Sequence, residues 1–110
     1  MSIVLEKDIE RNLKKLVESR GGRCLKWVCP GWSGVPDRIL LLPGAHVLFV
    51  ETKRPKGGKA SKLQEKWKKW LTDLGFVCFH VFNEQDLKAL EIFLKLHAHE
   101  LARAETRASK

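Results

Sequence analysis

Two strand-like runs separated by only four residues constrain this chain more than any other feature of its sequence. Residues 38–42 and 47–53 are rich in aliphatic side chains, and the segment PGAH (residues 43–46) joins them. A connection this short predicts an antiparallel β-hairpin. In such a hairpin the start of the first strand lies beside the end of the second. Polar groups at those two positions are therefore expected to meet at one end of the hairpin.

Periodic patterns on both sides of the hairpin predict an α/β fold, in which helices flank one mixed β-sheet in the order α-β-β-β-α-β-α. Glycines punctuate the helices, and Ser61 with Gln64 three residues later matches a capping box. The expected elements are a helix over residues 3–19, strands over 23–29, 38–42 and 47–53, a helix from Ser61 to Gly75, a buried strand over 76–82, and a last helix capped by Asn83.

Length and charge limit the classes of protein to consider. The 110 residues suffice for one small domain, expected over residues 1–97 and followed by a basic tail over 98–110. Lys and Arg number 21 against 13 Asp and Glu, and the net charge of +8 favours a polyanionic partner, nucleic acid or an anionic membrane surface. No apolar run approaches the roughly 18 residues of a membrane span, and the acidic N-terminus is unlike a signal peptide. We therefore expect a cytoplasmic protein.

Cysteine and histidine patterns give no metal site. The three cysteines, Cys24, Cys29 and Cys78, have no CxxC spacing, so we expect reduced and mostly buried thiols. The histidines also lack ligand spacing, and structural or surface roles are expected for them.

The candidate catalytic residues lie at the polar end of the hairpin. Asp37 follows a proline at the start of the first strand, and Glu51 and Lys53 share one face at the end of the second. Two converging carboxylates suit Mg²⁺ or Mn²⁺ better than zinc. Such an ion can lower the pKa of a bound water, and a neighbouring lysine can offset charge on a phosphate. Taken alone, a Glu-x-Lys pair is typical of a surface ion pair; the preceding Pro-Asp and the charge of +8 favour phosphodiester hydrolysis.

Pro36-Asp37 followed by Glu51-Thr52-Lys53 resembles the PD-(D/E)xK nuclease pattern. The wider strings GVPDRILLLPG and LFVETKRPKGG, then Ser-x-x-Gln on a helix, are similar to the VRR-NUC branch, the virus-type replication-repair nucleases. The resemblance covers about residues 5–90. It implies a restriction-endonuclease-like fold, with Asp37 and Glu51 as metal ligands, the backbone carbonyl of Thr52 completing the site, and Lys53 as the catalytic lysine.

The resemblance also implies two helix-borne residues. A glutamate of the first helix approaches the metal, and Glu6 and Glu10 both qualify because they are four residues apart on one helix face. Glu10 is favoured as both ligand and catalytic residue; the plain alternative is a pair of solvated helix acids. Gln64 is the expected catalytic glutamine, although it could instead only close the capping box with Ser61.

A run of basic residues directly after the Glu-x-Lys pair predicts a DNA-binding surface. Phosphate contacts from such residues give affinity without sequence reading. Trp32 can stack on an unpaired base or serve in packing, and Trp67 and Trp70 are expected in the core or a subunit interface. The expected DNA-binding residues are Arg38, Arg54, Lys56, Lys59, Lys62, Lys66 and Trp32.

Together these features predict a Mg²⁺- or Mn²⁺-dependent, structure-selective DNA endonuclease. The resemblance implies a homodimer that resolves four-way (Holliday) junctions in DNA repair, since a two-fold dimer presents two sites to two equivalent strands. A flap or nicking nuclease and a non-catalytic basic nucleic-acid-binding module are the alternatives. A membrane-surface role is disfavoured, because the apolar helix faces are needed to cover the sheet.

Overall fold

A four-stranded mixed sheet organises the chain in the computed structural model, which describes residues 6–97. Strands β1 (Arg23–Lys26), β2 (Arg38–Leu42), β3 (His46–Glu51) and β4 (Val77–His80) lie side by side in that order. The β1–β2 and β2–β3 pairs are antiparallel and the β3–β4 pair is parallel. The predicted hairpin and mixed sheet are confirmed. Residues 1–5 and the predicted tail over 98–110 lie outside the described residues.

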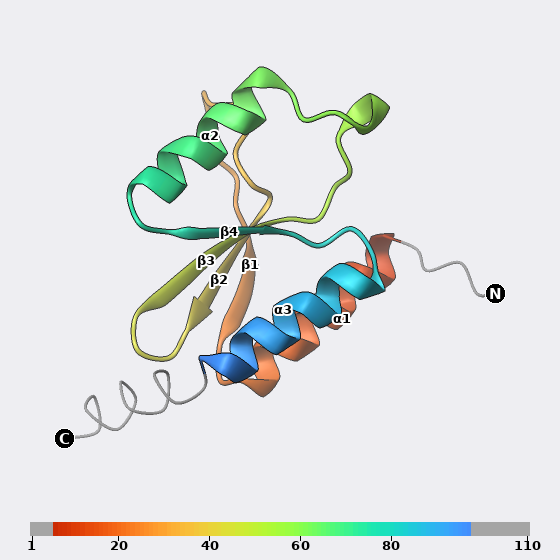
Figure 1. Cartoon of the computed structure of the whole chain (residues 1–110), viewed down its shortest axis with the longest axis vertical. Coiled ribbons are helices and arrows are strands. Elements are labelled where there is room, and N and C mark those ends of the chain that lie inside the picture. Colours follow the sequence, from red (N-terminus) through yellow and green to blue (C-terminus); the bar gives the residue numbers. More distant parts are fainter. Residues whose placement is uncertain (1–5, 98–110) are drawn as a thin grey trace.

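The helices occupy both faces of the sheet. Helices α1 (Glu6–Ser19) and α3 (Glu84–Leu96) lie together on one face, and α2 (Lys62–Asp73) covers part of the other (Figure 1). The predicted order of helices and strands is confirmed, with an additional short 3₁₀ helix, η1 (Lys56–Gly58), before α2. In the part of the chain that the structure describes, no helix is long and apolar enough to span a bilayer.

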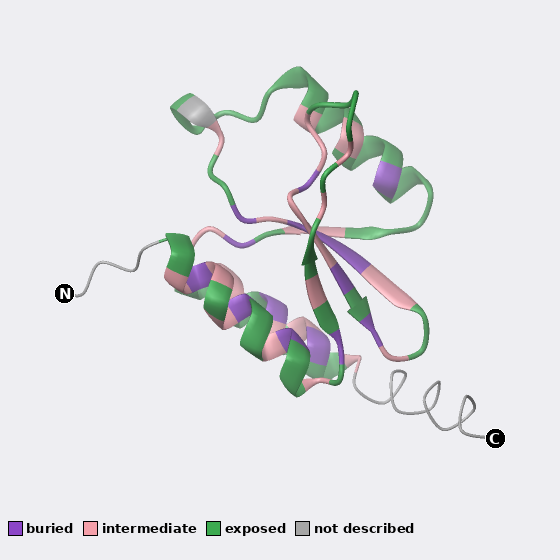
Figure 2. Cartoon of the chain, turned by 180° about the vertical axis from the view of Figure 1, so that it is seen from behind, coloured by how far each residue is buried: buried purple, intermediate pink, exposed green. Residues whose placement is uncertain are grey.

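The core lies between the sheet and the α1–α3 layer. Because successive strand residues point to opposite faces, every second side chain of β2 and β3 turns toward these helices. The buried stripes of α1 and α3 face the sheet from the other side (Figure 2). The core cluster comprises Ile9, Leu13, Val17, Leu40, Leu42, Leu48, Val50, Val81, Leu90 and Leu94.

The opposite face of the sheet carries an aromatic layer beneath α2. The ring of the buried Phe49 lies 5.0 Å from that of Trp27 and 5.2 Å from that of Phe76, measured between centroids. Trp67 of α2 packs edge-on against Trp27 and against Trp70. Trp67 therefore joins a packed aromatic cluster, whereas Trp70 keeps 43% of its surface exposed and is not a core residue.

The strand predicted as buried over residues 76–82 is wrong in its burial. β4 spans Val77–His80 at the edge of the sheet, and both of these end residues are exposed. An edge strand has a neighbour on one side only, and Leu71 is the one buried residue that α2 contributes over it. The cysteines are free and half-buried rather than mostly buried.

Burial in the core predicts that alanine substitutions at two positions of α3 will differ in their effect on stability. Leu90 is fully buried and Ile92 is 54% exposed. Leu90→Ala should lower the free energy of unfolding by about 2–5 kcal/mol, because it leaves a cavity between the helix and the sheet. Ile92→Ala, the matched control, should change it by less than about 0.5 kcal/mol. Urea unfolding followed by tryptophan fluorescence measures both. Equal losses would contradict the assigned orientation of α3.

Candidate active site

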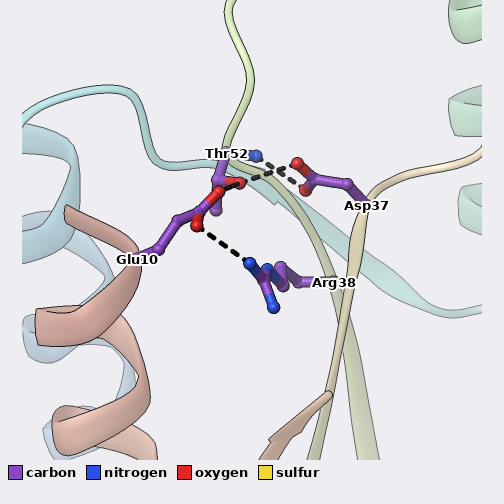
Figure 3. Close-up of polar contacts among 4 residues, drawn as sticks. All are labelled: Glu10, Asp37, Arg38 and Thr52. Carbon is purple, nitrogen blue, oxygen red and sulfur yellow. Dashed lines mark hydrogen bonds and ion pairs between the residues drawn. The ribbon is translucent and has the colours of Figure 1, made fainter. Parts of the chain in front are cut away.

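The end of β3 is held to the start of β2 by a side chain. The backbone N–H of Thr52 donates to Asp37 Oδ1 over 2.8 Å, and the Thr52 hydroxyl donates to Asp37 Oδ2 over 2.7 Å (Figure 3). The β2–β3 register would place Pro36 opposite Thr52, and proline has no N–H for the ladder. β3 ends at Glu51, and the Thr52 N–H donates to the Asp37 carboxylate instead of to a backbone carbonyl of β2.

Asp37 and Glu51 come together as the hairpin predicts. Burial and then the negative charge of Asp37 raise the pKa of the Glu51 carboxyl to about 7. The backbone N–H and the ammonium group of Lys53 act in the opposite direction, without cancelling the shift. Two carboxyl groups thus share a half-buried site where simultaneous ionisation is unfavourable.

Helix α1 adds a third carboxylate through Glu10. Glu10 Oε2 lies 3.0 Å from Nη2 of Arg38, and Glu10 Oε1 lies 3.3 Å from the Thr52 hydroxyl oxygen (Figure 3). Arg38 was expected to bind DNA, but strand alternation turns it to the same face as Leu40, toward α1. Its side chain is only 14% exposed, so it faces Glu10 rather than a DNA phosphate.

The second helix acid, Glu6, has different surroundings. Glu6 lines an open cavity of about 660 Å³ together with Lys53, Arg54 and Asn83. The structure thus places Glu10 against the Asp37–Thr52 pair and Glu6 beside the exposed Lys53. Both lie at the site, in different surroundings that a spacing of four residues could not distinguish.

Gln64 closes the predicted capping box and also borders a cavity beside Glu51. Its Oε1 accepts from the Ser61 N–H over 2.7 Å, and its own backbone N–H donates to Ser61 Oγ over 3.2 Å, which completes the capping box. The same residue lines a cavity of about 360 Å³ together with Glu51 and Lys68. The cap uses only Oε1 and the backbone N–H, so capping does not remove Gln64 from the site.

His80 is a neighbour of the site that the sequence did not reveal. The parallel β3–β4 register places it directly beside Glu51 on the same face of the sheet, and it lines the same cavity. Its ring stacks on Phe82 at a centroid distance of 4.8 Å, and its Nε2 lies 3.8 Å from Asp86. Only the pairing of β4 with β3, which periodicity does not indicate, would have identified it.

The basic segment borders these cavities. Gly34 has a φ of +86°, and a Cβ at this position would lie 2.7 Å from the Leu63 carbonyl carbon. The loop before Asp37 therefore packs against the start of α2 and brings that basic helix beside the site. Exposed members of the predicted DNA-binding set are Arg54, Lys59, Lys62, Lys66 and Trp32, whereas the side chain of Lys56 lies outside the described residues.

The donor set of Asp37 and Glu51 fits a hard divalent cation. Carboxylate oxygens are the ligands that Mg²⁺ and Mn²⁺ prefer. Such a charge would offset both the burial of Glu51 and its repulsion by Asp37, which together raise its pKa. Within residues 6–97, no three His, Cys, Asp or Glu side chains lie close enough together to hold a metal ion. Glu10 contacts Arg38 through Oε2, and its role as a third ligand stays a prediction.

Comparisons with known proteins identify chains of similar sequence and fold. No family model matches the chain. The chain is 38% identical over 90 residues to "Putative nuclease p44" of Acyrthosiphon pisum secondary endosymbiont phage 1, covering 82% of this chain and 95% of that protein. A solved structure described as "VRR_NUC domain" superposes with a TM-score of 0.69 at 27% identity, over 77% of this chain and 91% of that one.

The fold, the paired carboxylates and these relatives define the class of the protein as a nuclease. More particularly, the chain belongs to the VRR-NUC family.

The pKa of Glu51 predicts a pH-dependent stability in the absence of metal. Folded Glu51 keeps its proton up to about pH 7, whereas the unfolded chain releases it near pH 4.5. The contribution of this group to stability is therefore present below pH 4.5 and is lost as pH rises through 7. In EDTA, the melting temperature of the wild type should fall relative to that of Glu51→Gln between about pH 5 and 8. Parallel pH curves for the two proteins would contradict the shift.

Proposed function

We propose that this nuclease is a Mg²⁺- or Mn²⁺-dependent DNA endonuclease whose cation is held by Asp37 and Glu51. The observation that carries the proposal is the enforced proximity of these carboxyl groups in a half-buried site, where burial and then the charge of Asp37 raise the pKa of Glu51 to about 7. Asp37 cannot turn away, because Thr52 donates two hydrogen bonds to it. Two part-buried hydrogen bonds hold one acid beside a second acid of like charge, and a cation between them would stabilise this arrangement.

The bound cation would lower the pKa of a water molecule and neutralise charge on the scissile phosphate. Lys53 follows Glu51 by two residues, is exposed, and lines the neighbouring cavity. From that position its ammonium group can orient the attacking water and offset negative charge that develops at phosphorus. The Thr52 carbonyl is a further candidate ligand, and Gln64 borders the Glu51 cavity from α2.

The surroundings of the site suit a nucleic-acid backbone. Lys68 of α2 shares the cavity of Glu51, and Lys59, Lys62 and Lys66 are exposed in or before the same helix. Contacts from such lysines bind phosphates without reading sequence, so selectivity would come from DNA shape. Trp32 packs edge-on against Trp67 at 5.7 Å and is still 60% exposed, which leaves a face for an unstacked base.

In its most specific form, the proposal is that a homodimer of this chain cuts four-way DNA junctions. One domain of this size contacts only a short stretch of duplex, and two-fold symmetry would give one site to each of two equivalent strands. Exposed apolar side chains on the α2 side support a self-association surface, namely Trp70 at 43%, Leu74 at 74% and Phe76 at 38% exposure. A flap or nicking nuclease would share the site and differ in substrate and oligomeric state.

Cleavage assays on four-way junction, flap and linear duplex test the proposal. The wild type should cut the junction in Mg²⁺ or Mn²⁺ and should not cut in EDTA. Glu51→Ala and Lys53→Ala should lower the cleavage rate by about 10²–10⁴, while junction binding in Ca²⁺ survives. The matched control is Lys88→Ala, an exposed lysine of α3, which should cut like the wild type.

Each contrary result has a definite meaning. Metal-independent cutting, or full activity of Lys53→Ala, would overturn the mechanism. Binding without any cleavage by the wild type would favour the non-catalytic module. Preferential cutting of flaps by a protein with the mass of a monomer in light scattering would overturn the junction-resolving homodimer and leave the nuclease.

A further inference from the structure

A pair of stacked aromatic rings borders the two cavities of the site. The imidazole ring of His80 stacks on the ring of Phe82, with centroids 4.8 Å apart and ring planes 19° from parallel. Phe82 lines the cavity that contains Glu51 and also the neighbouring cavity that contains Lys53. A DNA phosphate bound at Glu51 and Lys53 would therefore bring its flanking nucleotide next to these rings.

One face of the His80 ring remains open to a ligand. Phe82 covers the other face, and 59% of the His80 side chain is still exposed. Other contacts hold the Phe82 side of the pair. The guanidinium carbon of Arg54 lies 5.7 Å from the centroid of the Phe82 ring, and the Phe82 N–H donates to Asp86 Oδ2 over 3.0 Å. The pair is thus supported from one side and presents a flat ring to solvent on the other.

The cavity beside His80 suits an uncharged base better than a second phosphate. Its volume of about 360 Å³ lies within the usual range of small-molecule pockets. A phosphate there would meet the carboxyl groups of Glu51 and Glu65, opposed by Lys68. The apolar side chains along the same cavity include those of Pro36, Pro55, Ala60, Cys78 and Phe79. A planar and largely apolar group therefore fits this space beside the open face of His80.

We propose that the open face of His80 is a stacking platform for an unpaired nucleobase of the DNA strand that is cut. Bases inside a duplex stack on one another, so an unpaired base is the one that can lie against a protein ring. Every base has a π-face, so the platform detects an unpaired nucleotide without reading its identity. This inference rests on the proposed function, which places the scissile phosphate at Glu51 and Lys53, and it makes His80 a determinant of selectivity for DNA structure.

DNA binding in Ca²⁺, measured by fluorescence anisotropy, tests the platform with two probes. The probes are a labelled single-stranded oligodeoxynucleotide and the blunt duplex of the same sequence. His80→Ala should lower affinity for the single strand on the order of tenfold, because the stacking contact is lost. Its affinity for the duplex should stay within about twofold of that of the wild type, since paired bases do not reach the ring.

Two further substitutions separate the ring from its polar atoms. His80→Phe keeps an aromatic face and should bind the single strand within about threefold of the wild type. His80→Gln keeps hydrogen-bonding groups without the ring and should lose as much affinity as His80→Ala. The matched control is His46→Ala, at the opposite end of β3 from Glu51, which should bind like the wild type. Thermal unfolding verifies that each variant is folded; if His80→Ala is not, the comparison of His80→Phe with His80→Gln decides the matter.

Salt dependence separates stacking from a phosphate contact. His80→Ala should leave the slope of log affinity against log salt unchanged, whereas Lys62→Met should reduce it by about 0.7 on the single strand. A reduced slope for His80→Ala, with equal losses on single strand and duplex, would overturn the proposal. Equal binding of the single strand by His80→Phe and His80→Gln would also overturn it, because the ring would then contribute nothing.

An abasic nucleotide next to the cut locates the platform. Once cleavage in Mg²⁺ has mapped the cut in a branched substrate, removal of the base on one side of it should weaken wild-type binding as much as His80→Ala does. The abasic substrate should show no further loss with His80→Ala, because both changes remove the same contact. Additive losses on both sides of the cut would contradict the placement of the platform.

The binding and cleavage results distinguish this inference from the proposed function. Metal-dependent cutting by the wild type, with equal single-strand binding by the wild type and His80→Ala, would contradict the platform alone. Binding that depends on the ring of His80, in a wild type that cuts no DNA in any metal, would support the platform and contradict the proposed function.

Discussion

The two hydrogen bonds from Thr52 to the Asp37 carboxylate support the whole site. They hold the chain at the point where β3 ends at Glu51. They also fix Asp37 close enough to Glu51 to raise the pKa of that carboxyl group. The end of the β2–β3 pairing and the pair of interacting acids therefore lie at the same place in the hairpin. The strand pairing supplies the geometry, and the buried threonine makes it rigid.

Strand alternation then divides the surroundings of this pair into two sides. Glu51 points to the α2 side, where Gln64, Lys68 and His80 line the same cavity. Arg38 points to the α1 side, where it meets Glu10. The α2 side is exposed and basic, as a phosphate-binding surface should be, and the α1 side is more buried and internally balanced in charge.

Local signals predicted the parts of the fold that depend on neighbours in sequence. The short turn predicted the β2–β3 hairpin and hence the meeting of Asp37 with Glu51, and Ser61 with Gln64 predicted the start of α2. Contacts between elements distant in the sequence could not be predicted from such local signals. The parallel pairing that brings His80 beside Glu51 joins strands separated by a helix, and periodicity does not identify such partners.

Tertiary structure also decides which of the candidate residues lie at the site. Glu6 and Glu10 share a helix face, so only the packing of α1 against the sheet places Glu10 at Thr52. Arg38 was assigned to DNA from its charge, although its alternation with the apolar Leu40 already indicated an inward direction. The burial of a charged strand residue is decided by its partner on another element, and here that partner is Glu10.

Anomalous diffraction from crystals grown with Mn²⁺ tests the central claim most directly. The account predicts one strong peak within about 2.1–2.3 Å of a carboxylate oxygen of Asp37 and of Glu51. A peak bound by only one of these acids, or none at either, would contradict the claim that the hairpin builds a shared cation site.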